Sequence, residues 1–152
     1  MAVAFRNVDV DLAAPIDTWP HEALVTLIER GTIRDWAVLT AEIRRQPWGE
    51  VARQVQEYLQ HQSPWGVGPL LSRAIVAARE DQERAERAEV ARRIVAAIDA
   101  SGLSQGQFAR RIGTSASRLS TYRSGAVVPS ATLLVRIERL GGVETDGPTR
   151  RR

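Results

Sequence analysis

The chain has no cysteine, which excludes a disulfide framework, a thiolate metal site and a cysteine nucleophile. Its only histidines, His21 and His61, belong to no motif with metal-ligand spacing. The Gly66–Gly68 segment is not a phosphate-binding loop, since it is followed by Pro69, which has no backbone N–H to donate. No motif places a base beside a serine. We therefore expect no metal, no cofactor and no enzymatic activity.

Long apolar runs are also absent. None approaches the roughly 18 residues of a membrane-spanning helix, and the N-terminus lacks the basic-then-apolar pattern of a secretion signal. Hydrophobic residues make up 43% of the chain, as in an ordinary globular protein. A length of 152 residues suits one domain or two small ones. We expect a cytoplasmic protein that does not enter a membrane.

Lysine is missing, so all 21 basic side chains are arginines, and they are unevenly distributed. Residues 1–83 contain 8 arginines and 12 acidic residues, whereas residues 84–152 contain 13 arginines and 6 acidic residues. Within 102–141, six arginines stand against Glu138 alone. Such an excess of positive charge is typical of a segment that binds nucleic-acid phosphates. We therefore expect DNA contact in the second half of the chain and not in the first.

The segment from Gly102 to Gly141 opens with signals for a short capped helix. Ser104 is a favoured N-cap residue, and Gln107 three positions later completes a capping box. The residues expected on its buried side, at helical spacing, are Phe108, Ala109 and Ile112. Gly113 is expected to end this helix in the left-handed conformation.

A second and a third helix are expected directly afterwards. Thr114 can cap the second helix, and Ser124-Gly125 ends it. Pro129-Ser130 then opens the third. The expected inward residues are Ala116, Leu119 and Tyr122 in the second helix and Leu133, Leu134 and Ile137 in the third. Two capped helices joined by a tight turn can present a helix end to the major groove of DNA. The alternative is a helical hairpin with no nucleic-acid role.

At these residues the chain resembles the Xre/Cro family of helix-turn-helix regulators. The similarity covers about a quarter of the chain and lies in four stretches: Leu103–Gln105, Phe108–Gly113, Arg118–Gly125 and Val128–Ser130. It implies that the helix beginning near Ser115 is the recognition helix and that Gln105 lies where the family often contacts the DNA backbone. Family members often have Gln or Asn at the reading positions. This chain has smaller residues there, which lack a bidentate hydrogen-bonding group, so its base specificity does not follow.

The expected DNA contacts fall into two sets. With Leu119 buried, the N-terminal end of the recognition helix points into the groove. Base contacts are expected from Ser115, Ala116, Ser117 and Thr121. Phosphate contacts are expected from Gln105, Arg110, Arg118 and Arg123, with help from the dipole of the first helix. The function expected is a homodimeric, sequence-specific regulator of transcription that binds double-stranded DNA, most often a repressor. The alternative is an antitoxin that binds a toxin through its N-terminal module and represses its own operon.

The fold class expected is all-α, with a small N-terminal helical module, a long linker helix and a C-terminal lambda-repressor-like domain. Its predicted parts are an extended arm (1–19), the helical module (20–78), a helical linker (79–88), the DNA-binding domain (89–141) and a disordered tail (142–152). The linker is expected because residues 80–87 are polar on nearly every helical face. The alternative is one continuous domain in which this stretch is a solvated helix face.

Three helices are expected within the N-terminal module. Pro20 opens the first and Gly31 ends it. Thr32, with Asp35 at the third position, opens the second, and Pro47 opens the third. The apolar residues expected on these helices are Leu24, Leu27 and Ile28, then Ile33, Trp36, Leu39 and Ile43, then Val51, Val55, Tyr58 and Leu59. A further helical pattern runs from Leu70 to about Ala100.

All four tryptophans, Trp19, Trp36, Trp48 and Trp65, lie in the first 65 residues. Tryptophan is frequent at binding hot spots, so this half of the chain is a candidate dimer or partner interface. The other interpretation is that these side chains fill the core of a small helical domain. Both interpretations remain open at this point.

Overall fold

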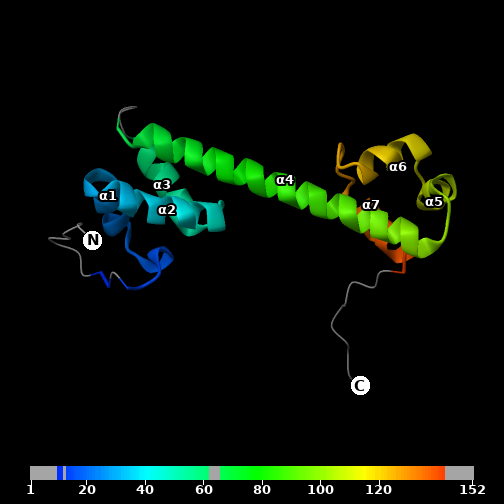
Figure 1. The fold of residues 1–152 in the computed structure, drawn as a ribbon, viewed down its shortest axis with the longest axis horizontal. Helices are drawn as coiled ribbons and strands as arrows, with labels where there is room; N and C mark the ends of the chain where they lie inside the picture. The colour runs from blue at the N-terminus through cyan, green and yellow to red at the C-terminus, as the bar shows by residue number, and fades with distance from the viewer. Residues whose placement is uncertain (1–9, 12, 62–65, 143–152) are drawn as a thin grey trace, which may run out of the picture. The chain divides into compact units, whose positions relative to one another are not determined.

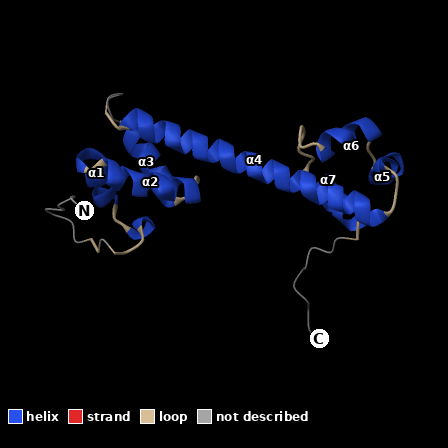
Figure 2. Ribbon diagram, in the orientation of Figure 1, coloured by secondary structure: helices blue, strands red, loops and turns tan. Residues whose placement is uncertain are grey.

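The computed structural model describes residues 10–11, 13–61 and 66–142, in which all regular structure is helical and no strand occurs (Figures 1 and 2). The α-helices are α1 (His21–Arg30), α2 (Ile33–Arg45), α3 (Glu50–Gln60), α4 (Gly68–Ser101), α5 (Gln105–Ile112), α6 (Ala116–Arg123) and α7 (Ala131–Leu140), preceded by a 3-10 helix, η1 (Ile16–Thr18). The predicted all-α class is confirmed. None of these helices combines the length and the apolar composition needed to cross a membrane.

The contacts of the chain divide it into two compact units, one ending at Gln82 and the other beginning at Glu83. We call them the N-terminal unit and the C-terminal unit. The boundary lies within α4, in the range predicted as a helical linker. Between Ala78 and Ile94 no residue of α4 is buried, which agrees with the polar pattern of that stretch. The predicted tail beyond Gly142 and most of the predicted arm lie outside the described residues.

The core of the N-terminal unit comes from η1, α1, α2, α3 and the first turns of α4. Its buried apolar residues are Ile16, Leu24, Leu27, Ile28, Leu39, Ile43, Val51, Ala52, Val55, Leu71, Ile75 and Ala78. Ile16 joins this core from the 3-10 helix η1, so residues 16–18 of the predicted extended arm are helical. Ile33, which we expected among the apolar residues of the second helix, is 80% exposed, because the buried side of α2 faces the opposite direction.

The starts of the first helices differ slightly from their predicted positions. Pro20 is the N-cap residue of α1 rather than its first helical residue. At Pro47 the chain forms a turn, and α3 begins only at Glu50, after Gly49. The predicted start of α2 is confirmed, since the backbone N–H and the hydroxyl of Thr32 both donate to the Asp35 carboxylate, at 2.7 and 2.8 Å. These two hydrogen bonds, that from the backbone first, hold the pKa of Asp35 below its usual value.

The tryptophans that the structure describes fall into two environments. Trp19 and Trp36 are partly buried, and their indole N–H groups donate to the carbonyls of Ala14 and Leu27, each at 3.1 Å. Trp48 is 52% exposed, and the Arg79 guanidinium lies 5.9 Å from the centroid of its ring. Trp65 lies outside the described residues. Two of the four therefore complete the N-terminal unit, while Trp48 lies on its surface.

The core of the C-terminal unit comes from the last turns of α4 together with α5, α6 and α7. Its buried residues are Ile94, Ala97, Ile98, Phe108, Ala109, Ile112, Leu119, Tyr122 and Ile137. Gly141 closes this core, because a Cβ atom on it would lie 2.5 Å from the Cα of Ala97. The backbone after α7 therefore approaches α4 more closely than any residue with a side chain would allow.

Candidate nucleic-acid interface

The first helix of the candidate interface, α5, begins as its sequence indicates. Ser104 is the N-cap residue, its hydroxyl accepts from the Gln107 backbone N–H at 3.3 Å, and the Gln107 side chain accepts from the Ser104 N–H at 3.0 Å. The predicted capping box is thus confirmed. Phe108, Ala109 and Ile112 are buried as expected, and they anchor the helix in the core of the C-terminal unit.

The turn after α5 is a Schellman motif. Gly113 has a φ of 80°, in the left-handed region that favours glycine, as predicted. The N–H of Thr114 donates to the Ala109 carbonyl at 2.9 Å, and that of Gly113 donates to the Arg110 carbonyl at 3.3 Å. Arg136 of α7 adds a further tie, since its Nη1 donates to the Ile112 carbonyl at 2.9 Å. The turn between the two helices is therefore held from both ends and from α7.

The second helix, α6, begins one residue later than expected. Ser115, not Thr114, is the cap, and its hydroxyl accepts from the Arg118 N–H at 3.1 Å. Leu119 and Tyr122 are buried as predicted, but Ala116 is exposed rather than inward. The reason is that a spacing of three residues does not by itself decide which side of a short helix faces the core. Ala116 therefore lies on the outer side of α6.

The outer face of α6 carries small polar side chains and arginines. Its exposed residues are Ala116, Ser117, Arg118, Ser120 and Arg123. Thr121 is half-buried, and its hydroxyl donates to the Arg118 carbonyl at 2.7 Å. The hydroxyl oxygen of Thr121 can therefore accept a hydrogen bond from a base, whereas that of Ser115, which already accepts from the backbone, can donate one. With the methyl of Ala116, this side can form hydrogen bonds and contact a thymine methyl.

Gln105 connects the two helices. Its Nε2 donates to the Ala116 carbonyl of α6 at 3.2 Å, and its Oε1 accepts from Nη1 of Arg123 at 3.0 Å. Both ends of the Gln105 amide thus bind the chain itself, so its structural role is to join the start of α5 to α6. The same contact orients Arg123 along α6. A phosphate contact from Gln105 would use the second hydrogen of its amide nitrogen.

The remaining arginines of α5 and α6 have guanidinium groups that are unpaired among the described residues. Arg110, Arg111 and Arg118 are exposed, and none of their guanidinium groups makes a hydrogen bond or an ion pair within the part of the chain that the structure describes. Arg110 and Arg118 were expected to contact phosphates. We did not predict a phosphate contact for Arg111, although it is exposed and lies in the last turn of α5, as Arg110 does.

The only acidic residue of 102–141 is removed from the surface. Glu138 is 7% exposed, and its Oε1 lies 3.5 Å from Nη1 of Arg93 on α4. The surface formed by residues 102–141 therefore presents arginines and no exposed carboxylate. Such a surface attracts a polyanion, since within residues 102–141 no exposed carboxylate offsets the field of the arginines.

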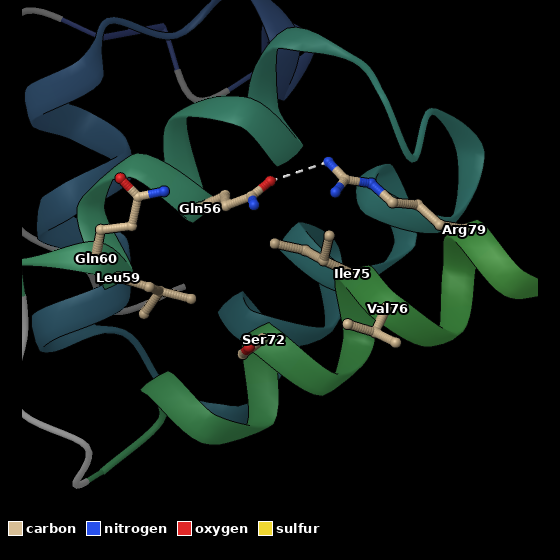
Figure 3. Close-up of a pocket in the computed structure, with 7 residues that line it drawn as sticks. All are labelled: Gln56, Leu59, Gln60, Ser72, Ile75, Val76 and Arg79. Atoms are coloured by element: carbon tan, nitrogen blue, oxygen red, sulfur yellow. Dashed lines mark hydrogen bonds between the residues drawn. The ribbon is translucent and has the colours of Figure 1, made fainter.

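The N-terminal unit contains a pocket of about 250 Å³ between α3 and α4 (Figure 3). Its lining residues are Gln56, Leu59, Gln60, Ser72, Ile75, Val76 and Arg79. Arg79 is bound, because its Nη2 donates to Gln56 at 3.1 Å and its Nε donates to the Pro47 carbonyl at 3.0 Å. The lining has no carboxylate and no histidine, so it offers no general base. No cluster of possible metal ligands occurs within the ranges that the structure describes.

Comparison with known proteins relates most of the C-terminal unit to a family of domains. A family model described as helix-turn-helix matches residues 87–147, a range that begins within α4 and includes α5, α6 and α7. No curated protein and no solved structure matches the chain. The match agrees with the geometry described above, in which two short capped helices are joined by a rigid turn and packed on a third.

Proposed function

We propose, from the match of residues 87–147 to a helix-turn-helix family model of the Xre/lambda-repressor-like type, that the protein is a homodimeric, sequence-specific repressor of transcription. The coarse function, a DNA-binding regulator of transcription, follows from the domain itself. The single observation that supports sequence-specific DNA binding is the outer face of α6, which combines the unpaired Arg118 with small side chains. Binding to chromosomal DNA would place the activity in the cytoplasm.

In this proposal α6 enters the major groove with its N-terminal end. Ser115, Ala116, Ser117 and Thr121 contact base edges, and the small size of these side chains allows the helix backbone to come close to the bases. Phosphate contacts come from Gln105, Arg110, Arg118 and Arg123. The Arg136 contact to the Ile112 carbonyl and the Gln105 bridge keep the two helices in one relative orientation, which the reading of a fixed sequence requires.

The homodimer is supported by exposed apolar side chains in the same unit. Val127 and Val128, in the loop after α6, and Val135 of α7 are between 44% and 47% exposed. A symmetric pair of helix-turn-helix units would read two half-sites separated by about one turn of DNA, roughly 34 Å, or a multiple of it. Sedimentation of the free protein and of its DNA complex would measure whether two copies bind.

The experiment that tests the proposal begins with selection of bound genomic fragments by the full-length protein. We expect a shared, pseudo-palindromic sequence, because a two-fold dimer binds two equivalent half-sites. Affinity for that sequence should fall about a thousandfold between roughly 50 and 200 mM salt if a dimer neutralises about six phosphates. Binding that does not depend on salt, or fragments without a common sequence, would contradict the proposal.

The antitoxin alternative is supported by a separate observation. The N-terminal unit has a core of its own and exposes large apolar side chains, among them Ile33, Val38 and Trp48. An independent unit of this kind suits binding to a protein partner. The test is to express the neighbouring gene alone: growth arrest that this chain relieves would support the alternative, and harmless expression would exclude that neighbour as a toxin.

A further inference from the structure

Helix α2 has one broad face that is open to solvent. The exposed residues of the helix, which together we call the α2 face, are Ile33, Arg34, Ala37, Val38, Ala41, Arg44 and Arg45. At about 100° of rotation per residue, all seven fall within an arc of about 140°. Ile33 and Val38 are large apolar side chains with 80% and 55% exposure. The α2 face is thus one continuous surface rather than a set of scattered positions.

The opposite side of α2 is fixed in the core. Asp35, Leu39 and Ile43 are buried, and the helix packs against α1, α3 and η1. Its first turn is closed by the hydrogen bonds between Thr32 and Asp35. The α2 face is therefore presented by a well-anchored helix, which lowers the entropic cost of binding a partner to it.

The distribution of charge on the α2 face is unusual for this half of the chain, where acidic residues exceed arginines. None of its seven residues is acidic. The nearest carboxylate along the helix, Glu42, is only 10% exposed and accepts hydrogen bonds from Arg45. By contrast, α3 exposes Glu50 and Glu57, both paired with Arg53. The middle of the α2 face is therefore formed by Ala37, Val38 and Ala41, with Arg34 toward one end and Arg44 toward the other, and Ile33 adds an exposed apolar side chain at the N-terminal end.

Two of these arginines are unpaired among the described residues. Neither Arg34 nor Arg44 makes a hydrogen bond or an ion pair in the part of the chain that the structure describes, whereas Arg45 is bound to Glu42 and Asp17. Arg34 lies in the first turn of α2 and Arg44 in the last, about 15 Å apart along the axis at 1.5 Å per residue. A partner helix of three to four turns would meet both charges.

A second copy of this chain does not fit the α2 face. Antiparallel pairing of two α2 helices would set Arg34 against Arg44 of the other copy, and parallel pairing would set each arginine against its own equivalent. Like charges opposed across a helix pair destabilise it. A helix with apolar residues in its centre and acidic residues toward both ends would be complementary in both respects. Ala37 and Ala41, small and central, let such a helix approach closely.

We propose that the α2 face binds an amphipathic, acidic helical segment of another protein. Val38 in the middle of the face and Ile33 at its N-terminal end are buried against the partner, and Arg34 and Arg44 pair with its carboxylates. This surface lies in the N-terminal unit and does not rest on DNA binding. It deepens the antitoxin alternative by naming the chemistry of the partner. The test uses no DNA, so a negative result would not bear on DNA binding, and a failure of DNA binding would not bear on the α2 face.

The test uses the full chain and a labelled probe. The probe is a fluorescein-labelled helical peptide of about 20 residues with leucines at i, i+3, i+4 and i+7 spacing and glutamates on both flanks. A second peptide carries lysine in place of every glutamate. Fluorescence anisotropy should show saturable binding of the glutamate peptide, weakened by salt, and no binding of the lysine peptide.

Variants locate the binding surface. Ala37→Glu and Arg34→Glu, both exposed and both in the first half of α2, should weaken binding of the glutamate peptide about tenfold or more. The matched controls are Ala77→Glu and Arg73→Glu, exposed positions on α4 of the same unit, which should change affinity less than twofold. Tryptophan fluorescence and circular dichroism of each variant verify folding.

Three results would overturn the proposal. The first is equal affinity for the two peptides, or no saturable binding of the glutamate peptide. The second is an equal loss of affinity in the α4 controls. The third is self-association of the free chain that Ala37→Glu abolishes, which would show by sedimentation that a second copy occupies the α2 face.

Discussion

Helices α2 and α6 both expose a face that carries arginines, yet the two faces differ in what lies between the charges. On α2 the residues between Arg34 and Arg44 on the exposed face are Ala37, Val38 and Ala41, and Ile33 adds a second large exposed apolar side chain at the N-terminal end. On α6 the centre is formed by small side chains, Ala116, Ser117 and Ser120. An apolar centre gains free energy when another protein removes it from water. A small polar centre gains little in that way, but it lets backbone and side chains approach base edges.

The surroundings of the two helices differ as well. Around α6, residues 102–141 contribute no exposed carboxylate, since Glu138 is buried. Around α2, neighbouring helices carry acidic residues that are already engaged, such as Glu50 and Glu57 with Arg53. In the two proposals, the same residue type, arginine, therefore binds a polyanion on α6 and discrete carboxylates on α2. Arginine content alone does not identify a DNA-binding surface.

The largest expected effect separates the two faces completely. Phe108 is fully buried in the core of the C-terminal unit, and Phe108→Ala should destabilise that unit by about 3–5 kcal/mol. DNA binding should be lost, while the glutamate peptide should still bind the α2 face. Tryptophan fluorescence should stay native, because all four tryptophans lie in the first 65 residues. A simultaneous loss of the tryptophan signal would break the comparison, since the two units would then unfold as one.

The next effect concerns the division of roles on α6. Thr121→Ala should change discrimination at one or two base positions by about 1–3 kcal/mol, with little change in non-specific binding. Arg118→Ala should instead weaken binding to all sequences alike and lower the slope of log affinity against log salt by about one. Both are measured by titration of selected and scrambled duplexes at several salt concentrations.

Arg53→Ala, in the N-terminal unit, is the matched control and should leave both DNA quantities unchanged. An unaltered preferred sequence in Thr121→Ala would mean that α6 lies in the groove with another face. A change of sequence preference in Arg118→Ala would mean that this arginine reads bases rather than phosphate.

The smallest effect concerns the anchoring of α2. Thr32 donates two hydrogen bonds to the Asp35 carboxylate and holds its pKa low in the folded state. A lowered folded pKa stabilises the fold above the unfolded value, about 3.9, and this contribution is lost as the pH falls through the folded pKa. Asp35→Asn should therefore destabilise the N-terminal unit by about 1 kcal/mol at neutral pH.

Urea unfolding followed by tryptophan fluorescence measures this effect. The difference between Asp35→Asn and the natural chain should shrink as the pH is lowered below about 4. Glu80→Gln, an exposed position on α4, serves as the control and should match the natural chain at neutral pH. A difference that persists unchanged in acid would show that the carboxylate charge is not what stabilises the start of α2.

Local signals predicted most of the candidate interface. The capping box of Ser104 and Gln107 and the left-handed Gly113 depend on residues a few positions apart, so they can be identified from sequence. The start of α6 could not, because Thr114 and Ser115 are both good caps, and only packing decides which one begins the helix. Ala116 was placed inward for the same reason, since a spacing of three residues does not by itself set the phase of a short helix.

Two contacts of the interface had no local signal. Arg136 reaches the Ile112 carbonyl across 24 positions, and Arg123 reaches Gln105 across 18. Sequence alone counted both arginines as positive charge. The structure shows that each is also a tie between helices, while Arg110, Arg111 and Arg118 keep their guanidinium groups uncommitted. Which arginines are available to phosphate is thus decided by the fold.

The sequence by itself determined the helical class, the caps at Thr32, Ser104 and Ser130, the left-handed turn and the concentration of arginine in the second half, because each depends on composition or on residues close together in the chain. The tertiary structure decided which side of each helix is covered. Ile33 and Val38 are as hydrophobic as typical core residues, yet they are exposed. The buried side of α2 is formed by Asp35, Leu39 and Ile43. A helix of mixed apolar pattern can bury only the side that its neighbours reach, and those neighbours are brought there by residues far away in the sequence.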